Sequence, residues 1–287
     1  MKKFLSSPLL GCSLSLSQPD YLEGIIKQAI FYQARAITFS LSPSQRYNLP
    51  DRAKLNVANF HKLLKKHGFK KELIAVHASY LINLANFTNR QVYRRSVDFL
   101  KKSLEITSYM GIQKIILHPG YALENNRKMA LDSIVEGLDE ILGDFPQMEI
   151  CLETMSGKGS ELGKNFDELK YIIENSQYSP QIKVCFDTCH LFAAGYDIVN
   201  DFDGVLKLFD TKVGLDKLVV LHINDSLKPF RSFKDRHANI GKGEIGYEVL
   251  RKIVHHFQIQ NLPMFLETPH KKGEPPLFKE EIEMLIS

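Results

Sequence analysis

Six short apolar runs in this chain each end on a histidine or an acidic residue, and that repetition constrains the fold more than any other feature. The runs are 73–76 before His77, 114–117 before His118, 150–152 before Glu153, 183–186 before Asp187, 218–221 before His222 and 264–266 before Glu267. Each run is short and apolar enough for a strand that is buried on both faces, as in a parallel sheet. With 33 acidic residues and 10 histidines among 287, about one position in seven would carry such a residue by chance. Six coincidences therefore indicate a shared position at the ends of strands.

Stretches with helical periodicity lie between these runs. Apolar residues recur on one helical face in the segments 53–64, 97–106, 134–142, 166–173 and 249–254. Gly68, Gly111 and Gly143 stand where helices are expected to stop. Two earlier strands are expected at 9–13 and 36–39. Eight strands alternating with helices predict an α/β fold, a closed (β/α)8 TIM barrel that forms a single domain over the whole chain, 1–287.

The ligand-type residues lie where a barrel carries its active site. In a TIM barrel the catalytic residues lie at the C-terminal ends of the strands, and all six residues fall there. A doubly wound open sheet is the structural alternative, but its crevice draws on a few neighbouring strands rather than on six of eight. The four cysteines lack the pairing of a zinc finger, which favours buried free thiols.

Further ligand-type residues follow in two places. His190 comes three residues after Asp187, so one strand exit carries both a carboxylate and an imidazole. For either residue alone, a helix N-cap or a structural histidine is the more common role. The long segment 224–246 shows no convincing regular element, and loops of that length are usually functional or disordered. Within it, Asp235 and His237 could meet one ion, although a solvated basic loop is the alternative.

The N-terminus carries a weak likeness to a lipoprotein signal. Two lysines precede a short apolar stretch and Cys12, but Ser6, Ser7 and Pro8 interrupt that stretch. Cleavage before Cys12 would also remove part of the first expected strand. We therefore expect a cytoplasmic protein, with no segment that spans a membrane. The formal net charge of +4 permits a polyanionic partner without requiring one.

Several blocks of the sequence resemble the signature blocks of the endonuclease IV family of apurinic/apyrimidinic (AP) endonucleases. The blocks are SYLINL at 79–84, HPG at 118–120, GKGSELG at 157–163, CFDTCHLFAAGYD at 185–197, HINDS at 222–226 and DRHANIGKG at 235–243. They occur in family order and with family-like spacing, from about the second strand to Glu267. The resemblance implies a zinc-dependent TIM barrel for DNA base excision repair. Such an enzyme cleaves the backbone 5′ of abasic sites and trims blocked 3′ ends as a 3′-phosphatase and phosphodiesterase.

The resemblance also implies three zinc ions per chain, held by nine ligands. These are His77, His118 and Glu153 for the first zinc; Glu153 as a bridge, with Asp187, His222 and Glu267, for the second; and His190, Asp235 and His237 for the third. Imidazole and carboxylate without thiolate form a hydrolytic ligand set rather than a closed structural one. Glu153, as the bridge, and Glu267, as the carboxylate that orients or deprotonates the attacking water, are the expected catalytic residues.

Recognition of a missing base requires side chains that wedge into the base stack. By resemblance, Arg46, Tyr80 and Leu81 match the positions that insert at the lesion, with ordinary loop packing as the alternative for Tyr80 and Leu81. Phosphate contacts are expected from the basic loop through Lys228, Arg231 and Lys234. The expected partner is double-stranded DNA with abasic sites or blocked 3′ ends, bound by a monomer.

Two other functions fit parts of the pattern. A metal-dependent sugar isomerase or epimerase of the xylose-isomerase-like barrels would use Glu153, Asp187, His222 and Glu267. It would leave the Asp235 and His237 loop without a role. A nucleic-acid-binding barrel that has lost catalysis predicts at least one missing ligand, and all nine are present. The AP endonuclease is therefore the favoured function.

Overall fold

The computed structural model describes residues 8–42, 47–122 and 126–287 of the chain. The strands are β1 (Leu10–Leu14), β2 (Ile37–Ser40), β3 (Ile74–His77), β4 (Lys114–Leu117), β5 (Glu149–Glu153), β6 (Ile182–Asp187), β7 (Leu218–His222), β8 (Asp225–Ser226), β9 (His237–Ala238) and β10 (Met264–Leu266). The α-helices are α1 (Tyr21–Phe31), α2 (Val57–His67), α3 (Arg90–Tyr109), α4 (Arg127–Leu142), α5 (Phe166–Asn175), α6 (Thr188–Ala194), α7 (Phe202–Lys212), α8 (Tyr247–Val254) and α9 (Phe278–Ile286). Short 3₁₀ turns are η1 (Arg52–Lys54), η2 (Lys71–Leu73), η3 (Ser179–Gln181) and η4 (Leu215–Lys217).

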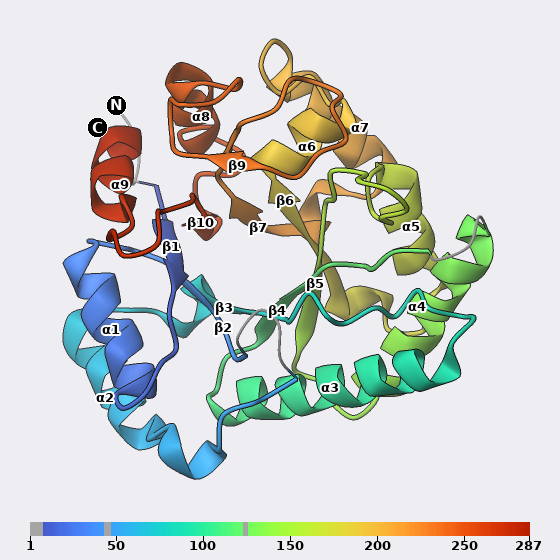
Figure 1. Cartoon of the computed structure of the whole chain (residues 1–287), viewed down its shortest axis with the longest axis horizontal. Helices are drawn as coiled ribbons and strands as arrows, with labels where there is room; N and C mark the ends of the chain where they lie inside the picture. The colour runs from blue at the N-terminus through green and yellow to red at the C-terminus, as the bar shows by residue number, and fades with distance from the viewer. Residues whose placement is uncertain (1–7, 43–46, 123–125) are drawn as a thin grey trace.

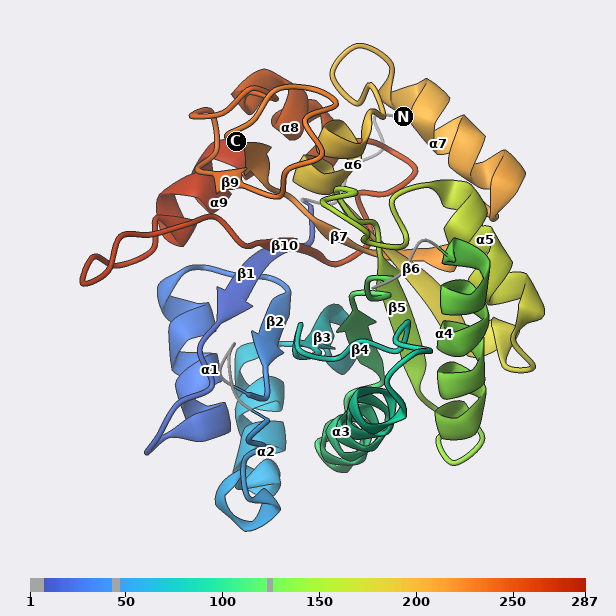
Figure 2. The same cartoon turned by 45° about the vertical axis from the view of Figure 1, so that its right-hand side comes forward.

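Eight of these strands close into a barrel. Their order around it is β1, β10, β7, β6, β5, β4, β3 and β2, and every neighbouring pair is parallel. Helices surround the strands on the outside, as Figures 1 and 2 show for α1 to α5. The (β/α)8 barrel expected from the sequence is confirmed, and each strand end lies within one residue of the expected one. No helix within the described ranges is long and apolar enough to cross a membrane.

The core has two layers. The larger layer packs the outer faces of the strands against the helices. A small inner layer fills the barrel itself and consists of Ala36, Ala75, Ile116, Cys151, Cys185, Val220 and Phe265. Gly11 in β1 lies so close to the next strand that a Cβ atom there would sit 1.7 Å from the carbonyl oxygen of Ala36. The barrel therefore closes at this point only with glycine.

Local sequence signals explain where the outer helices begin and end. An asparagine or aspartate side chain caps five of them by accepting a backbone N–H of the first turn; these residues are Asn56, Asn89, Asn126, Asn165 and Asp201. Gly68 and Gly111 have φ angles of +74° and +71°, a left-handed conformation that glycine adopts without strain. Gly68 directly follows α2, and Gly111 is the second residue after α3, so both lie at helix ends as predicted.

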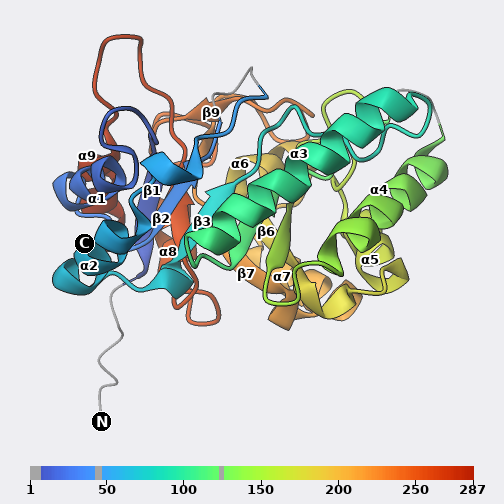
Figure 3. The same cartoon turned by 90° about the horizontal axis from the view of Figure 1, so that it is seen from below.

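The long loop after β7 is more ordered than the sequence predicts. We expected no regular element between 224 and 246, but β8 and β9 pair antiparallel, with Asp225 opposite Ala238 and Ser226 opposite His237. Strands of two residues are too short to leave an apolar alternation, so periodicity could not reveal them. In Figure 3 this hairpin lies at the upper edge of the molecule. It brings His237 back to the mouth of the barrel.

Candidate metal centre

The ligand-type residues line the inside of the barrel mouth because of strand geometry. Side chains alternate between the two faces of a strand, so residues i and i+2 point the same way. The inner layer holds Ala75, Ile116, Cys151, Cys185, Val220 and Phe265. Two positions further along the same strands come His77, His118, Glu153, Asp187, His222 and Glu267. The second set therefore forms the next layer above the inner core, at the C-terminal ends of the strands.

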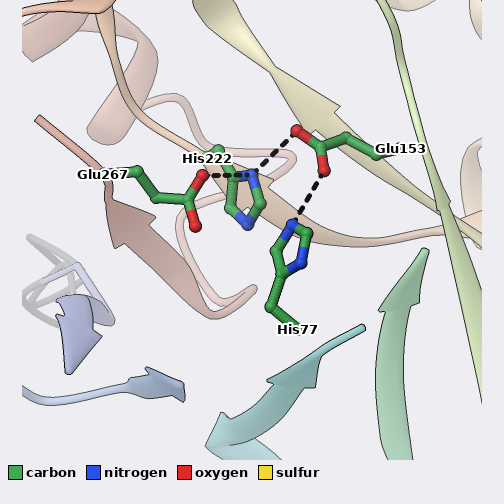
Figure 4. A group of neighbouring side chains, drawn as sticks. All are labelled: His77, Glu153, His222 and Glu267. Atoms are coloured by element: carbon green, nitrogen blue, oxygen red, sulfur yellow. Dashed lines mark hydrogen bonds and ion pairs between the residues drawn. The ribbon is translucent and has the colours of Figure 1, made fainter. Parts of the chain in front are cut away.

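Glu153 lies at the centre of this layer, with only 1% of its side chain exposed. Its Oε2 atom is 3.2 Å from Nε2 of His77 and 3.0 Å from Nε2 of His118. Its Oε1 atom is 3.1 Å from Nδ1 of His222, which is also 3.3 Å from Oε2 of Glu267. Figure 4 shows His77, Glu153, His222 and Glu267, with dashed lines from the two oxygens of Glu153 to His77 and His222. The two oxygens of one carboxylate thus face two different groups of ligand atoms, which is the geometry of a bridge.

A second cluster lies beside the first. Oδ1 of Asp235 is 3.4 Å from Nε2 of His190 and 3.5 Å from Nε2 of His237. Asp187 lies between the clusters, since its Oδ2 atom is 3.8 Å from Nδ1 of His222 and 3.6 Å from Nε2 of His237. The loop after β7 therefore delivers two of the three side chains of this cluster, as the sequence analysis expected from Asp235 and His237.

The hydrogen bonds of the histidines leave acceptor atoms facing each other. Nδ1–H of His190 donates to the carbonyl of Thr154 at 2.9 Å, and Nδ1–H of His237 donates to the carbonyl of Glu267 at 3.2 Å. In the neutral imidazoles each Nε2 then carries a lone pair, and both are buried without a hydrogen-bond partner among the described residues. The two Nε2 atoms and the Asp235 carboxylate converge, and their spacing suits a cation. His77 is fixed similarly, by Nδ1–H donation to the carbonyl of Ala78 at 2.8 Å.

The distances suit a metal ion. Ligands about 2.1 Å from one tetrahedral ion lie about 3.4 Å from each other, given the bond lengths typical of zinc. The separations of 3.4 and 3.5 Å around Asp235 match that value, and those around Glu153 range from 3.0 to 3.3 Å. Four overlapping groups of histidine, cysteine and acidic residues are spaced to hold an ion. One includes Cys189, a thiol whose pKa burial raises to about 12.

Electrostatics agree with a site built for cations. Burial alone would raise the pKa of Glu153, but His222 and His118 outweigh burial and hold this pKa well below its usual value. Burial opposes protonation of His190, yet the carboxylates of Asp187, Asp235 and Glu153 raise its pKa well above the usual value. Without a metal, protons on the imidazoles balance the carboxylates. Metal ions would replace those protons, because a histidine binds metal in its neutral form.

Two residues that orient the ligands were not assigned a role from the sequence. Asn224 is fully buried; its Nδ2 donates to Oδ2 of Asp187 at 2.7 Å, and its Oδ1 accepts from the backbone N–H of Glu267 at 2.9 Å. It therefore fixes two ligand-bearing strand ends at once. Asp187 has a double role, since its Oδ1 also accepts from the N–H of His190 and so caps α6. The N-cap role of Asp187 is confirmed, and its Oδ2 atom still faces His222 and His237, so its ligand role stays a prediction.

Asp225 is the second such residue, and it organises the loop that carries Asp235 and His237. Its side chain is completely buried and accepts five backbone N–H groups. The donors are Ser226, Ile245 and Gly246 to Oδ1, at 2.8, 3.0 and 3.2 Å, and Gly241 and Gly243 to Oδ2, both at 3.0 Å. The start and the end of the loop are therefore attached to one carboxylate. Asn224 and Asp225 stand two and three residues after His222 in the HINDS block, and that position is the signal that could have revealed them.

Replacing Asp225 by Asn is expected to loosen this loop. An amide keeps the size of the side chain but turns one oxygen into a donor, which then faces backbone N–H groups. Hydrogen bonds to charged groups contribute about 1.5–3 kcal/mol each, so we expect a loss of about 2–3 kcal/mol in the free energy of unfolding. Urea denaturation measures that loss, and amide exchange at Gly241 and Gly243 should accelerate. Asp216→Asn, an exposed residue of η4, is the control; equal behaviour of the two variants would contradict the anchoring role.

The residues expected to contact DNA lie at the same mouth where the structure describes them. Tyr80 is 47% exposed on the loop after β3, and Leu81 next to it is half-buried. Arg231 and Lys234 are exposed and Lys228 is half-buried on the loop after β7. Arg46 lies outside the described residues. These three cations lie on the same loop as Asp235 and His237, and their DNA contacts stay a prediction.

Comparison with known proteins gives consistent matches. The family described as the xylose isomerase-like TIM barrel matches residues 32–287. The chain is 42% identical over 280 residues to "Probable endonuclease 4" of Geobacillus kaustophilus, covering 96% of this chain and 93% of the relative. The crystal structure of endonuclease IV from Thermus thermophilus superposes with a TM-score of 0.84 at 27% identity, covering 97% of each chain. A D-tagatose 3-epimerase-like protein reaches a TM-score of 0.72, but at 18% identity, covering 96% of this chain and 95% of that one, it shares only the fold.

Proposed function

This chain belongs to the endonuclease IV family of DNA-cleaving hydrolases, and we propose that it incises duplex DNA on the 5′ side of abasic sites. We further propose that three zinc ions serve the reaction and that the same centre trims blocked 3′ ends. The observation that carries the proposal is the joining of His190 with Asp235 and His237. A sugar epimerase needs only the cluster around Glu153, whereas phosphodiester cleavage has a use for further positive charge at the leaving oxygen.

The nine side chains divide into three sites. His77, His118 and Glu153 would hold one ion; Glu153, Asp187, His222 and Glu267 a second; and His190, Asp235 and His237 a third. Zinc suits a set of imidazoles and carboxylates that leaves positions open. Bound there, zinc ions would neutralise phosphate charge and lower the pKa of a coordinated water.

The expected roles of the side chains differ with their burial. Glu153 and Asp187 are closed to solvent and would fix the spacing of the ions. Glu267 is 21% exposed, His118 24% and Asp235 36%, so the substrate phosphate would approach on their side. Glu267 is the carboxylate best placed to orient the attacking water and accept its proton. Asn224 keeps that residue in position through the backbone bond described above.

The experiment that tests the proposal uses one duplex with a single tetrahydrofuran abasic analogue, labelled at the 5′ end of the damaged strand. We expect one product, ending in a 3′ hydroxyl directly before the lesion. A second duplex with a 3′ phosphate at a nick should release inorganic phosphate. The same preparation should leave ketose sugars such as D-fructose unchanged. Epimerisation of a ketose with intact DNA would contradict the proposal and favour the sugar-converting class.

The basic loop is expected to set the salt dependence of DNA binding. Each phosphate contact contributes nearly one unit to the slope of log affinity against log salt concentration, whatever the DNA sequence. Replacing Lys228, Arg231 and Lys234 together by Ala should therefore flatten the slope by about two to three units.

The matched control removes three exposed lysines of α2 instead, Lys62, Lys65 and Lys66. These lie on a helix outside the barrel, so the slope should not change. Metal content should be the same in both triple variants. A slope that stays unchanged in the loop variant would assign these three cations to solubility and leave phosphate binding to other residues of the mouth.

We also propose that the protein acts as a monomer. The candidate centre is complete within one chain, since all nine side chains come from the same barrel. Sedimentation at micromolar concentration should give a single species of about 33 kDa, in line with the chain mass of 32.8 kDa. A dimer as the active species would contradict this part of the proposal.

A further inference from the structure

An exposed aromatic ring lies on the loop after β7, two residues before the ligand-type residue Asp235. The side chain of Phe233 is 45% exposed, although water-exposed rings of that size are unfavourable. Its backbone has φ of +51°, and that of Arg231 has φ of +59°. Both angles are uncommon for residues with a side chain, and such strain concentrates at functional sites. The loop therefore holds this ring outward at a cost in conformational energy.

Specific contacts keep the loop in this conformation. The N–H of Phe233 donates to the carbonyl of Ala193 at 3.1 Å, and the N–H of Arg231 donates to the carbonyl of Phe192 at 3.3 Å. Both carbonyls belong to α6, the helix that also carries His190. The ring of Phe233 lies over Gly157, where a Cβ atom would approach the ring to 3.1 Å. The backbone of Phe233 is thus held by α6, and its ring packs against the loop at Gly157.

One cation lies close to the ring, and further cations lie on the same loop. Nζ of Lys164 lies 5.7 Å from the centre of the Phe233 ring, and Lys234 follows in the chain. The guanidinium of Arg231 lies 5.3 Å from the ring of Phe230. An exposed flat ring among cations fits a ligand that combines a flat apolar face with phosphate, which is a nucleotide unit of DNA. Proteins that bind unpaired bases use this same combination of an aromatic platform and a basic surface.

We propose that Phe233 stacks on the base that an abasic site leaves without a partner, and so contributes to the choice of lesion. The inference rests on the proposed function. Moving a base out of the duplex costs least where its pairing is already lost, which singles out the base opposite the lesion. Phe233 is a specificity-determining residue in this proposal, distinct from Tyr80 and Leu81 on the loop after β3.

The test compares steady-state kinetics of the metal-loaded enzyme on two duplexes. Both carry one tetrahydrofuran analogue, and the second also lacks the base opposite it. For Phe233→Ala we expect KM on the first duplex to rise about tenfold, the scale of base–aromatic stacking, with kcat changed less than threefold. On the second duplex the rise in KM should be less than twofold, because the stacking partner is gone. Phe233→Tyr should behave like the wild type on both.

Controls separate stacking from folding. Phe233→Leu keeps an apolar side chain but lacks the aromatic face, so it should show most of the increase in KM with an unchanged melting temperature. Phe257→Ala removes a ring that is 71% exposed beyond α8 and should change nothing. The inhibition constant of undamaged duplex should be the same for wild type and Phe233→Ala.

Four results would overturn the proposal. An unchanged KM for Phe233→Ala would remove any role in binding. An equal rise on both duplexes, or an equal loss of undamaged-duplex binding, would make the contact non-specific or structural. A change of oligomeric state in Phe233→Ala, seen by sedimentation, would assign the ring to a contact between copies of the chain. If the wild type cleaves neither duplex, the proposed function itself fails, and that failure is distinct because it precedes any comparison of variants.

Discussion

Replacing Glu153 by Gln is expected to lower kcat for abasic incision by at least about a thousandfold, which corresponds to about 4 kcal/mol of lost transition-state stabilisation. The two oxygens of Glu153 face different groups, Oε2 towards His77 and His118 and Oε1 towards His190 and His222. Glutamine keeps the length of the side chain but offers one neutral oxygen, so the bridge between two sites is lost. Single-turnover incision of the tetrahydrofuran duplex measures the effect.

The comparison variant is His237→Ala, which removes one ligand of one site and leaves the bridge intact. We expect the activity to fall about ten- to a hundredfold and the metal content to fall by about one ion per chain. Both variants must show the circular dichroism spectrum of the wild type. If His237→Ala costs more activity than Glu153→Gln, the central position of Glu153 is wrong.

Complete removal of metal is expected to abolish incision while the barrel stays folded. The ligands form a layer above the inner core, and the apolar contacts of both core layers do not depend on them. Without metal, protons can balance the negative charge of the carboxylates. The carboxylates around His190 raise the pKa of this residue and favour its protonated form. Dialysis against a chelator, followed by activity and circular dichroism measurements, tests both halves of the prediction.

Adding back zinc should restore activity to the chelated protein, and adding magnesium should not, because imidazole ligands suit zinc and not magnesium. Unfolding before the loss of activity would show that the ions are structural. Full activity in excess chelator would exclude a metal-dependent reaction.

The barrel and most of the residues at its mouth could be predicted because the two-residue alternation along the strands determines both. Alternation along a strand places Ala75 and His77 on the same side, and likewise Val220 and His222, so apolar runs that end in ligand-type residues reveal strand and site together. The lack of zinc-finger pairing among the four cysteines predicted buried free thiols. The structure confirms four buried free thiols among the described residues.

The features that could not be predicted depend on contacts that leave no periodic pattern in the sequence. The hairpin of β8 and β9 depends on Asp225, whose five bonds join Ser226 to residues up to twenty positions later. A single sequence shows the acid and the glycines but not which N–H groups meet it. The exposure of Phe233 has the same origin, because its direction is set by a left-handed backbone and by a carbonyl of α6.

We propose that the strand ends and the loop after β7 build one centre for three metal ions. Elemental analysis of the purified, folded protein, without chelator at any step, counts these ions. The nine converging side chains predict about three zinc ions per chain, falling to about two in His237→Ala. One metal ion or fewer per folded chain, or a value that His237→Ala leaves unchanged, would contradict a trinuclear centre.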